Sequence, residues 1–315
     1  MRSLSIYLPL LFLSACVTAQ ESPPAAVPYI DAHSHLLPGM TPPQEAAFFR
    51  KAGLAGFVIM HPDLTPVQEM RQGNEGYVVP SFSLARLPDM PGLRLSEGSA
   101  SAMAVAADAG TVCGFGEIPT RIMPRTEPSD DLSLLNPNRL AIYRAANARG
   151  LPVNLHVDIV TPAVEASIAR IASDYPKTKI VLAHAGWSAS PALIERLMAE
   201  HSNIYADLSV RLDPAGGLPS EPLPPGSQPP GAMQSISIIQ PDGSLKAEWH
   251  TLIARFPDRF LFALDMSEYQ RPKHIDLLMA TARKALSPLG SATENAVAHG
   301  NIERLFRGCR TGFGR

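Results

Sequence analysis

The first apolar run of the chain, Tyr29–His35, carries two histidines near its end, His33 and His35. Side chains two residues apart on a β-strand point to the same face, so both imidazole rings can reach one metal ion. A His-x-His pair by itself is common and predicts little. Its weight depends on whether other residues with ligand atoms are brought beside it.

Four such residues end later apolar runs, namely Glu117, His156, His184 and Asp265. Imidazoles and carboxylates crowded into one buried place are costly unless they are paired or coordinated, and a divalent cation offsets that cost. Nitrogen and oxygen ligands without thiolate favour Zn²⁺, with Mn²⁺, Co²⁺, Fe²⁺ and Ni²⁺ as alternatives. The sequence therefore predicts a divalent metal centre.

Eight apolar runs rich in β-branched residues must position these side chains, and they alternate with longer, helix-like stretches. The predicted strands are Tyr29–His35, Ala55–His61, Gly76–Ser83, Thr111–Ile118, Pro152–Val157, Lys179–His184, Asn203–Ser209 and Arg259–Asp265. The predicted helices include Pro42–Lys51, Asn138–Arg149, Thr161–Tyr175, Pro191–Glu200 and Lys273–Leu286. This alternation is typical of repeated βα units.

We therefore predict an α/β fold, a (β/α)8 TIM-type barrel, in which active sites form at the carboxyl ends of the strands. A doubly wound open sheet is the alternative, but no Gly-rich phosphate loop follows the first strand. Two loops leave from the predicted active-site end: Arg86–Ala100 after the third strand, and the long Pro/Gly-rich Arg211–Gly243 after the seventh. Both are candidate lids or substrate walls, and a disordered spacer is the alternative for the longer one.

The bulk composition favours a small-molecule partner. The 315 residues are 45% hydrophobic and 18% charged, which suits one large domain, predicted over residues 29–308 with a tail at 309–315. A formal net charge of -2 creates no long-range field that would gather nucleic acid or an anionic membrane surface. Nothing in the sequence indicates an oligomeric state.

The N-terminus is typical of an export signal. Arg2 precedes the apolar stretch Leu4–Leu13, which is too short to span a bilayer by itself. We predict a signal peptide over residues 1–19 and a flexible tether over residues 20–28. The protein is then expected in the bacterial periplasm.

Two processing routes fit this leader. The segment Leu13–Cys16 resembles the bacterial lipoprotein box, in which cleavage precedes the cysteine and Cys16 is lipidated. The small residues of Val17–Ala19 suit ordinary signal cleavage instead. A lipid on Cys16 would be the protein's only membrane contact.

Outside the leader only Cys113 and Cys309 remain, so we expect no disulfide framework. If Glu117 faces the barrel mouth, alternation along the strand points Cys113 into the barrel interior. Cys309 lies in the tail, so we expect the two cysteines to lie far apart.

These residues, in this order, resemble the amidohydrolase superfamily and, within it, the amidohydrolase-related (amidohydrolase 2) group, which also holds decarboxylases and lactonases. The resemblance covers Tyr29 to about Phe306. It rests on Asp31-Ala32-His33-Ser34-His35, Asn154-Leu155-His156, Leu182-Ala183-His184-Ala185-Gly186, Pro257–Asp265, and the segment Glu294–Phe306, which looks like the family's closing helix.

The resemblance implies roles for the ligands. His33 and His35 would bind a first ion together with Asp265. With two ions, His156 and His184 would bind the second and Glu117 would bridge, in place of the carboxylated lysine of many members. With one ion, His156 would join the first set and His184 would polarise the substrate or orient the water.

The implied reaction is hydrolysis of a C–N or C–O bond in a small amide, cyclic amide, lactone or ester. A metal-activated water would attack the carbonyl, and Asp265 would take its proton and pass it to the leaving group. Asp265 and His184 are thus the candidate catalytic residues. A metal-dependent decarboxylase acting on a carboxylated aromatic or enol is the alternative, and a binding protein without catalysis is a third.

Four further residues are candidates for substrate contact. His61 ends the second strand on the same rim, with support of a ligand or helix capping as the alternative. Arg121 and Arg211 would bind a substrate carboxylate by a two-point contact, or form surface salt bridges. Trp187 follows the sixth strand and would form a wall of the pocket. Asp207 on the seventh strand would support a ligand or accept a structural hydrogen bond.

Overall fold

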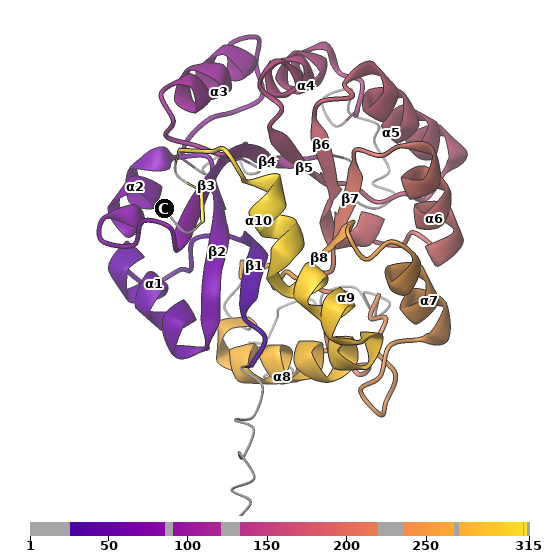
Figure 1. Cartoon of the computed structure of the whole chain (residues 1–315). Coiled ribbons are helices and arrows are strands. Elements are labelled where there is room, and N and C mark those ends of the chain that lie inside the picture. Colours follow the sequence, from indigo (N-terminus) through magenta and orange to yellow (C-terminus); the bar gives the residue numbers. More distant parts are fainter. Residues whose placement is uncertain are drawn as a thin grey trace, which may run out of the picture.

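The computed structural model describes residues 26–85, 91–120, 133–219, 236–267, 271–310 and 312–313. Eight parallel strands form one sheet in the order β1-β2-β3-β4-β5-β6-β7-β8, and helices surround it (Figure 1). The N–H groups of Ala32 and His35 donate to the carbonyls of Phe262 and Met266, each at 3.0 Å. These bonds join β1 to the end of the sheet, so the predicted (β/α)8 barrel is confirmed.

Each predicted strand overlaps one observed strand. The strands are β1 (Tyr29–Ser34), β2 (Leu54–His61), β3 (Val78–Phe82), β4 (Gly114–Pro119), β5 (Pro152–His156), β6 (Lys179–Leu182), β7 (Ile204–Asp207) and β8 (Phe260–Leu261). The α-helices are α1 (Pro42–Lys51), α2 (Leu64–Arg71), α3 (Ser99–Asp108), α4 (Pro137–Arg149), α5 (Pro162–Asp174), α6 (Pro191–Glu200), α7 (Ala247–Arg255), α8 (Ile275–Leu286), α9 (Ser291–Asn295) and α10 (Asn301–Leu305). Of these helices, α2, α3 and α7 were not predicted, and α9 and α10 overlap the segment Glu294–Phe306, which was expected as a closing helix from the family resemblance.

Two of the strands that were predicted to carry metal ligands end at least two residues earlier than predicted. Strand β6 stops at Leu182, and His184 follows in the short 3-10 turn η2 (Ala183–Gly186) with φ 54°. Strand β8 stops at Leu261, and Asp265 has φ 49°. A left-handed conformation cannot continue a strand, so both residues lie just past the strand ends, on the loops of the active-site face.

Side-chain caps fix where several helices start. Asn136, Thr161 and Ser190 each accept a hydrogen bond from a backbone N–H in the first turn of α4, α5 and α6. Each of these helices also has proline in its first turn, where the missing N–H costs nothing. The helices that follow β4, β5 and β6 therefore begin at defined points behind the loops that carry the ligands.

The expectation for the two cysteines is wrong in part. Cys113 does face the barrel interior, with 1% of its surface exposed, but it forms a disulfide with Cys309 at a Cα–Cα distance of 5.5 Å. Cys113 precedes β4 and so lies at the amino-terminal end of the barrel. The segment after α10 folds back over that end, where Phe306 joins the same apolar cluster (Figure 1).

The long loops are described in part. Residues 86–90 and 220–235 lie outside the described ranges, but Leu212, Ile238 and Ile239 at the two ends of the longer loop are buried. The predicted signal peptide, Cys16 and most of the tether also lie outside them. Among the described residues, no helix combines the length and the apolar character needed to cross a bilayer.

Candidate metal centre

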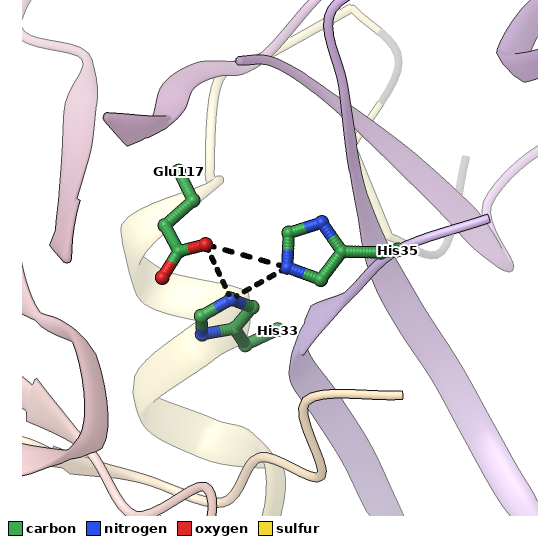
Figure 2. A group of neighbouring side chains, drawn as sticks. All are labelled: His33, His35 and Glu117. Atoms are coloured by element: carbon green, nitrogen blue, oxygen red, sulfur yellow. Dashed lines mark hydrogen bonds and ion pairs between the residues drawn. The ribbon is translucent and has the colours of Figure 1, made fainter. Parts of the chain in front are cut away.

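Two histidines, one at the end of β1 and one just after it, meet carboxylates from opposite sides of the barrel at its carboxyl end. The Nε2 atoms of His33 and His35 lie 3.1 Å apart. Both nitrogens face Glu117 Oε2, at 3.6 and 3.4 Å, as Figure 2 shows. Both also face Asp265 Oδ1, at 3.8 and 3.4 Å.

The other two predicted ligands face the second oxygen of each carboxylate. His184 Nε2 lies 3.7 Å from Glu117 Oε1 and 4.0 Å from Asp265 Oδ2. His156 Nδ1 contacts Glu117 Oε1 directly. The structure thus brings all six predicted ligands together, and Glu117 and Asp265 lie between two sides of the cluster.

The separations suit a bound cation. Nitrogen ligands at about 2.1 Å from a tetrahedral ion lie roughly 3.4 Å from one another. The spacings among His33, His35 and Glu117 are 3.1, 3.4 and 3.6 Å. Because the donors are imidazole nitrogens and carboxylate oxygens, the site fits a divalent metal without selecting one.

Hydrogen bonds at the far edges of the β1 imidazoles direct their lone pairs toward this centre. His35 Nδ1 lies 3.2 Å from the Met60 carbonyl oxygen, which can only accept, so Nδ1 carries the hydrogen. His33 Nδ1 donates to Asp207 Oδ2 at 3.1 Å. In neutral rings, Nε2 of both residues is then the ligand atom.

The charges of the cluster reinforce one another. Burial would raise the pKa of Asp265, but the neighbouring His33, His35 and His184 hold it well below its usual range. Burial would lower the pKa of His33, but the carboxylates of Asp207 and Asp265 raise it above its usual value. A cation would displace a proton held by such a histidine, so metal binding should release protons.

A glycine sets the path of the backbone beside Glu117. Gly116 has φ +123°, and a Cβ atom on it would lie 2.5 Å from the carbonyl oxygen of Asn154. Strands β4 and β5 can approach this closely only without a side chain there. Position 116 therefore requires glycine if Glu117 is to reach His156.

The predicted substrate residues lie in different surroundings. The ring of Trp187 stands edge-on to the ring of His184, with 4.9 Å between the ring centroids, and its centroid lies 5.7 Å from that of His156. Trp187 therefore forms a wall on that side of the cluster. His61 is buried, and its Nδ1 lies 2.7 Å from the carbonyl oxygen of Asp63, the N-cap residue of α2. The cap of α2 is the Asp63 side chain, which accepts from the Thr65 N–H at 2.9 Å, so His61 contacts only the backbone of the capping residue. Arg121 lies outside the described residues.

Arg211 is built into the fold. It is only 5% exposed, and burial lowers its pKa to about 10. Its guanidinium donates to four backbone carbonyls, among them His184 at 2.9 Å and Ala189 at 3.0 Å. These contacts exclude the predicted surface salt bridge, and they occupy the donors that a substrate carboxylate would need.

Three residues around the ligands received little or no weight in the sequence. Asp207 accepts from His33, and Asn154 Nδ2 donates to the same oxygen at 3.0 Å. Ser209 Oγ lies 2.8 Å from His184 Nδ1. The sequence does carry a signal for Asn154 and Ser209. Each lies two residues from another polar residue of the site, His156 or Asp207, and side chains two apart on a predicted strand share one face.

Known proteins share this architecture. A family model described as Amidohydrolase matches residues 45–308. No curated protein is similar enough in sequence to count as a relative.

Solved structures share the fold at low identity. A TatD homologue from Escherichia coli K12 has 16% identity, a TM-score of 0.58, and coverage of 88% of this chain and 97% of its own. An amidohydrolase II has 16% identity, a TM-score of 0.52, and coverage of 88% and 99%. A 2,6-dihydroxybenzoate decarboxylase complexed with 2,6-dihydroxybenzoate has 11% identity, a TM-score of 0.52, and coverage of 90% and 100%.

Proposed function

The chain belongs to the amidohydrolase family, and from that premise we propose that it is a metal-dependent hydrolase of small molecules. Its substrate would be an amide, cyclic amide, lactone or ester, cleaved at the C–N or C–O bond. The observation that carries the proposal is the convergence of four imidazoles and the carboxylates of Glu117 and Asp265 at the active-site end of the barrel.

A bound divalent metal would lower the pKa of a water molecule toward 7 and polarise the substrate carbonyl. The residues that would hold it are His33, His35, His156 and His184, with the two carboxylates between them. Zn²⁺ is our first candidate, since the donors are nitrogen and oxygen atoms at tetrahedral spacing.

Asp265 is the proposed proton carrier. Its side chain is 15% exposed, whereas that of Glu117 is 1% exposed, so Asp265 is the carboxylate within reach of an incoming substrate. The histidines that lower its pKa keep it ionised and ready to accept a proton from water. It would then donate that proton to the leaving group. His184, beside Trp187, would bind an ion together with His156.

We propose two ions rather than one. Glu117 and Asp265 each direct one oxygen to the side of His33 and His35 and the other to the side of His184. With Asp207 ionised as well, one cation would leave the buried cluster with a net negative charge. Two cations would leave one positive charge, which the loss of a proton from water would cancel. Saturation of the metal-free protein by a single equivalent of Zn²⁺ would contradict this count.

The decisive experiment combines metal analysis with product analysis. Protein purified without chelator is assayed for metal, then screened against amides, lactones and carboxylated aromatics. Asp265→Asn should abolish turnover at full metal loading, while the exposed Asp258→Asn serves as the matched control. Folded protein that retains almost no metal would refute the proposal, and turnover retained by Asp265→Asn would remove the proton-carrier role.

The second candidate is a decarboxylase, because one structure with this fold carries that activity. Release of CO₂ from a carboxylated aromatic, without hydrolysis of any amide or lactone, would favour this reaction. The metal ligands would be the same, so metal content cannot separate the two reactions. Product analysis can.

Export is also part of the proposal. Disulfides persist in oxidising compartments, and the bond between Cys113 and Cys309 fits the periplasm predicted from the leader. A lipid on Cys16 would add an anchor to the membrane. Cys16→Ala should move the protein from the membrane to the soluble periplasmic fraction and abolish labelling by a radioactive fatty acid. Wild-type protein that is already in the soluble periplasmic fraction and takes up no fatty acid would show ordinary signal cleavage instead.

A further inference from the structure

The carboxylate of Asp207, at the end of β7, accepts hydrogen bonds from residues that lie on or just after β1, β5, β6 and β7. It is fully buried. Its Oδ2 accepts from His33 Nδ1 at 3.1 Å and from Asn154 Nδ2 at 3.0 Å. Its Oδ1 accepts from the backbone N–H of His184 at 3.0 Å and of Ser209 at 3.2 Å, and from the Ser209 hydroxyl.

The acceptor in each of these bonds determines which partner atom carries the hydrogen. Both oxygens of Asp207 already accept from N–H groups, Oδ1 from His184 and Ser209 and Oδ2 from Asn154, so the carboxylate is the acceptor in each bond. The Ser209 hydroxyl therefore gives its one hydrogen to Asp207. Its oxygen then accepts from His184 Nδ1, 2.8 Å away. His184 Nδ1 must carry a hydrogen.

We propose that Asp207 and Ser209 are positioning residues that set the tautomers of two metal ligands from different strands. Asp207 acts on His33 directly and on His184 through the Ser209 hydroxyl. Both rings then present the lone pair of Nε2 to the side of Glu117 and Asp265. The inference rests on the proposed metal-dependent function, since only a cation makes the choice of Nε2 matter.

A direct ligand role for Asp207 fits the geometry less well. Its oxygens face Nδ1 of His33, whereas the centre shared with His35 and Glu117 lies at the opposite edge of that ring. An ion between Asp207 and His33 would have to replace the 3.1 Å hydrogen bond. Asp207 therefore acts on the ion through other residues.

His35 provides an internal reference. Its Nδ1 donates to the carbonyl of Met60 and has no dependence on Asp207 or Ser209. A substitution that merely loosens the barrel would disturb all three rings. A substitution that acts through the proposed hydrogen bonds should change the tautomer of one ring and leave the Nδ1–H of His35 as it was, although His35 Nε2, 3.1 Å from His33 Nε2, will respond to a hydrogen that moves there.

The two substitutions should have separate effects. In Asp207→Asn the N–H groups of His184 and Ser209 still require an acceptor, so the amide oxygen stays on their side and its NH₂ turns toward His33. The NH₂ then also faces Asn154, whose own amide must turn so that its oxygen accepts. Nδ1 of His33 must then accept, and its hydrogen moves to Nε2, where a metal should bind. In Ser209→Ala only His184 loses its acceptor, so it should become a mixture of tautomers.

The test reads the tautomers in metal-free full-length protein by ¹⁵N NMR of labelled histidine, at about pH 9, where ordinary imidazoles are neutral. Ser237→Ala is the matched control, because Ser237 is also buried and its hydroxyl donates to the Asp213 carbonyl at 2.6 Å, outside the cluster. An unchanged Nδ1 signal of His35 reports an intact fold. If Asp207→Asn does not fold, Ser209→Ala, which removes a single hydroxyl, carries the test.

Zn²⁺ affinity, measured by competition with a chromophoric chelator, should fall roughly 10- to 100-fold in each variant and stay unchanged in Ser237→Ala. The inference is overturned if His184 keeps one tautomer in Ser209→Ala, or if Zn²⁺ affinity is unaltered. The inference and the proposed function can fail independently of each other. Wild-type protein that shows the expected tautomers but binds none of Zn²⁺, Mn²⁺, Co²⁺, Fe²⁺ and Ni²⁺ would sink the metal-dependent reaction while leaving the hydrogen-bond relay established.

Discussion

Breaking the disulfide between Cys113 and Cys309 is expected to lower the free energy of unfolding by several kcal/mol. The bond joins residues separated by 196 positions, so it removes much of the freedom of the unfolded chain. The loop-closure relation gives about 5 kcal/mol for such a loop at 25 °C, as an upper estimate. Cys309→Ser leaves the Cys113 thiol among apolar neighbours, where it packs as a small hydrophobic group, so little cost arises besides the lost cross-link.

Urea unfolding of oxidised wild type, reduced wild type and Cys309→Ser measures the effect. Reduced wild type and the variant should unfold at the same midpoint, below that of the oxidised protein. Hydrogen exchange should rise first in α9, α10 and the segment that follows, because the bond holds them over the barrel end. Coincident midpoints for the oxidised protein and Cys309→Ser, with no free thiol in the former, would refute this account.

Three further changes have defined outcomes. Burial raises the pKa of Glu45 from 4.5 to about 7, so the folded protein binds the extra proton and its stability falls as pH rises through that window. Glu45→Gln in metal-free protein should therefore gain about 3 kcal/mol above roughly pH 8 and nothing near pH 4 in urea titrations; equal gains at both would contradict the assignment. Gly116→Ala should lose Zn²⁺ affinity and a few kcal/mol of stability, because the new Cβ would clash with Asn154. The control Gly73→Ala introduces only the strain of a positive φ and should keep the affinity. Zn²⁺ at 100 times its dissociation constant should raise wild-type stability by about 2.7 kcal/mol in thermal scans, and an unmoved transition would argue against a native-state site.

The barrel and the grouping of the candidate ligands could be predicted because parallel barrel strands are buried on both faces. Such strands appear as continuous apolar runs, and β1 to β8 each overlap one predicted run. The rule that the carboxyl ends of parallel strands share one rim then placed His33, Glu117 and His156 together. The strand ends were less certain, since the left-handed φ of His184 and Asp265 depends on hydrogen bonds made in three dimensions, such as Asp265 N–H to the His33 carbonyl at 2.8 Å.

The cysteine pair shows where alternation along a strand stops being informative. Alternation correctly placed Cys113 in the barrel interior, but it cannot say what covers the amino-terminal end. That depends on the path of the chain after α10, which returns Cys309 to within 5.5 Å between Cα atoms. A residue near the C-terminus is distant in sequence from every strand, so its neighbour in space is set by packing of the closing helix.

The supporting hydrogen bonds are harder to predict than the ligands for a chemical reason. A metal accepts few side-chain types, so histidine and carboxylate at strand ends are informative wherever they recur. An imidazole Nδ1–H needs only an acceptor, and here three different ones serve: a carboxylate for His33, a hydroxyl for His184 and a backbone carbonyl for His35. Because any of these satisfies the ring, no residue type marks the role. Asp207 becomes recognisable only when the fold places β1, β5 and β6 around one carboxylate.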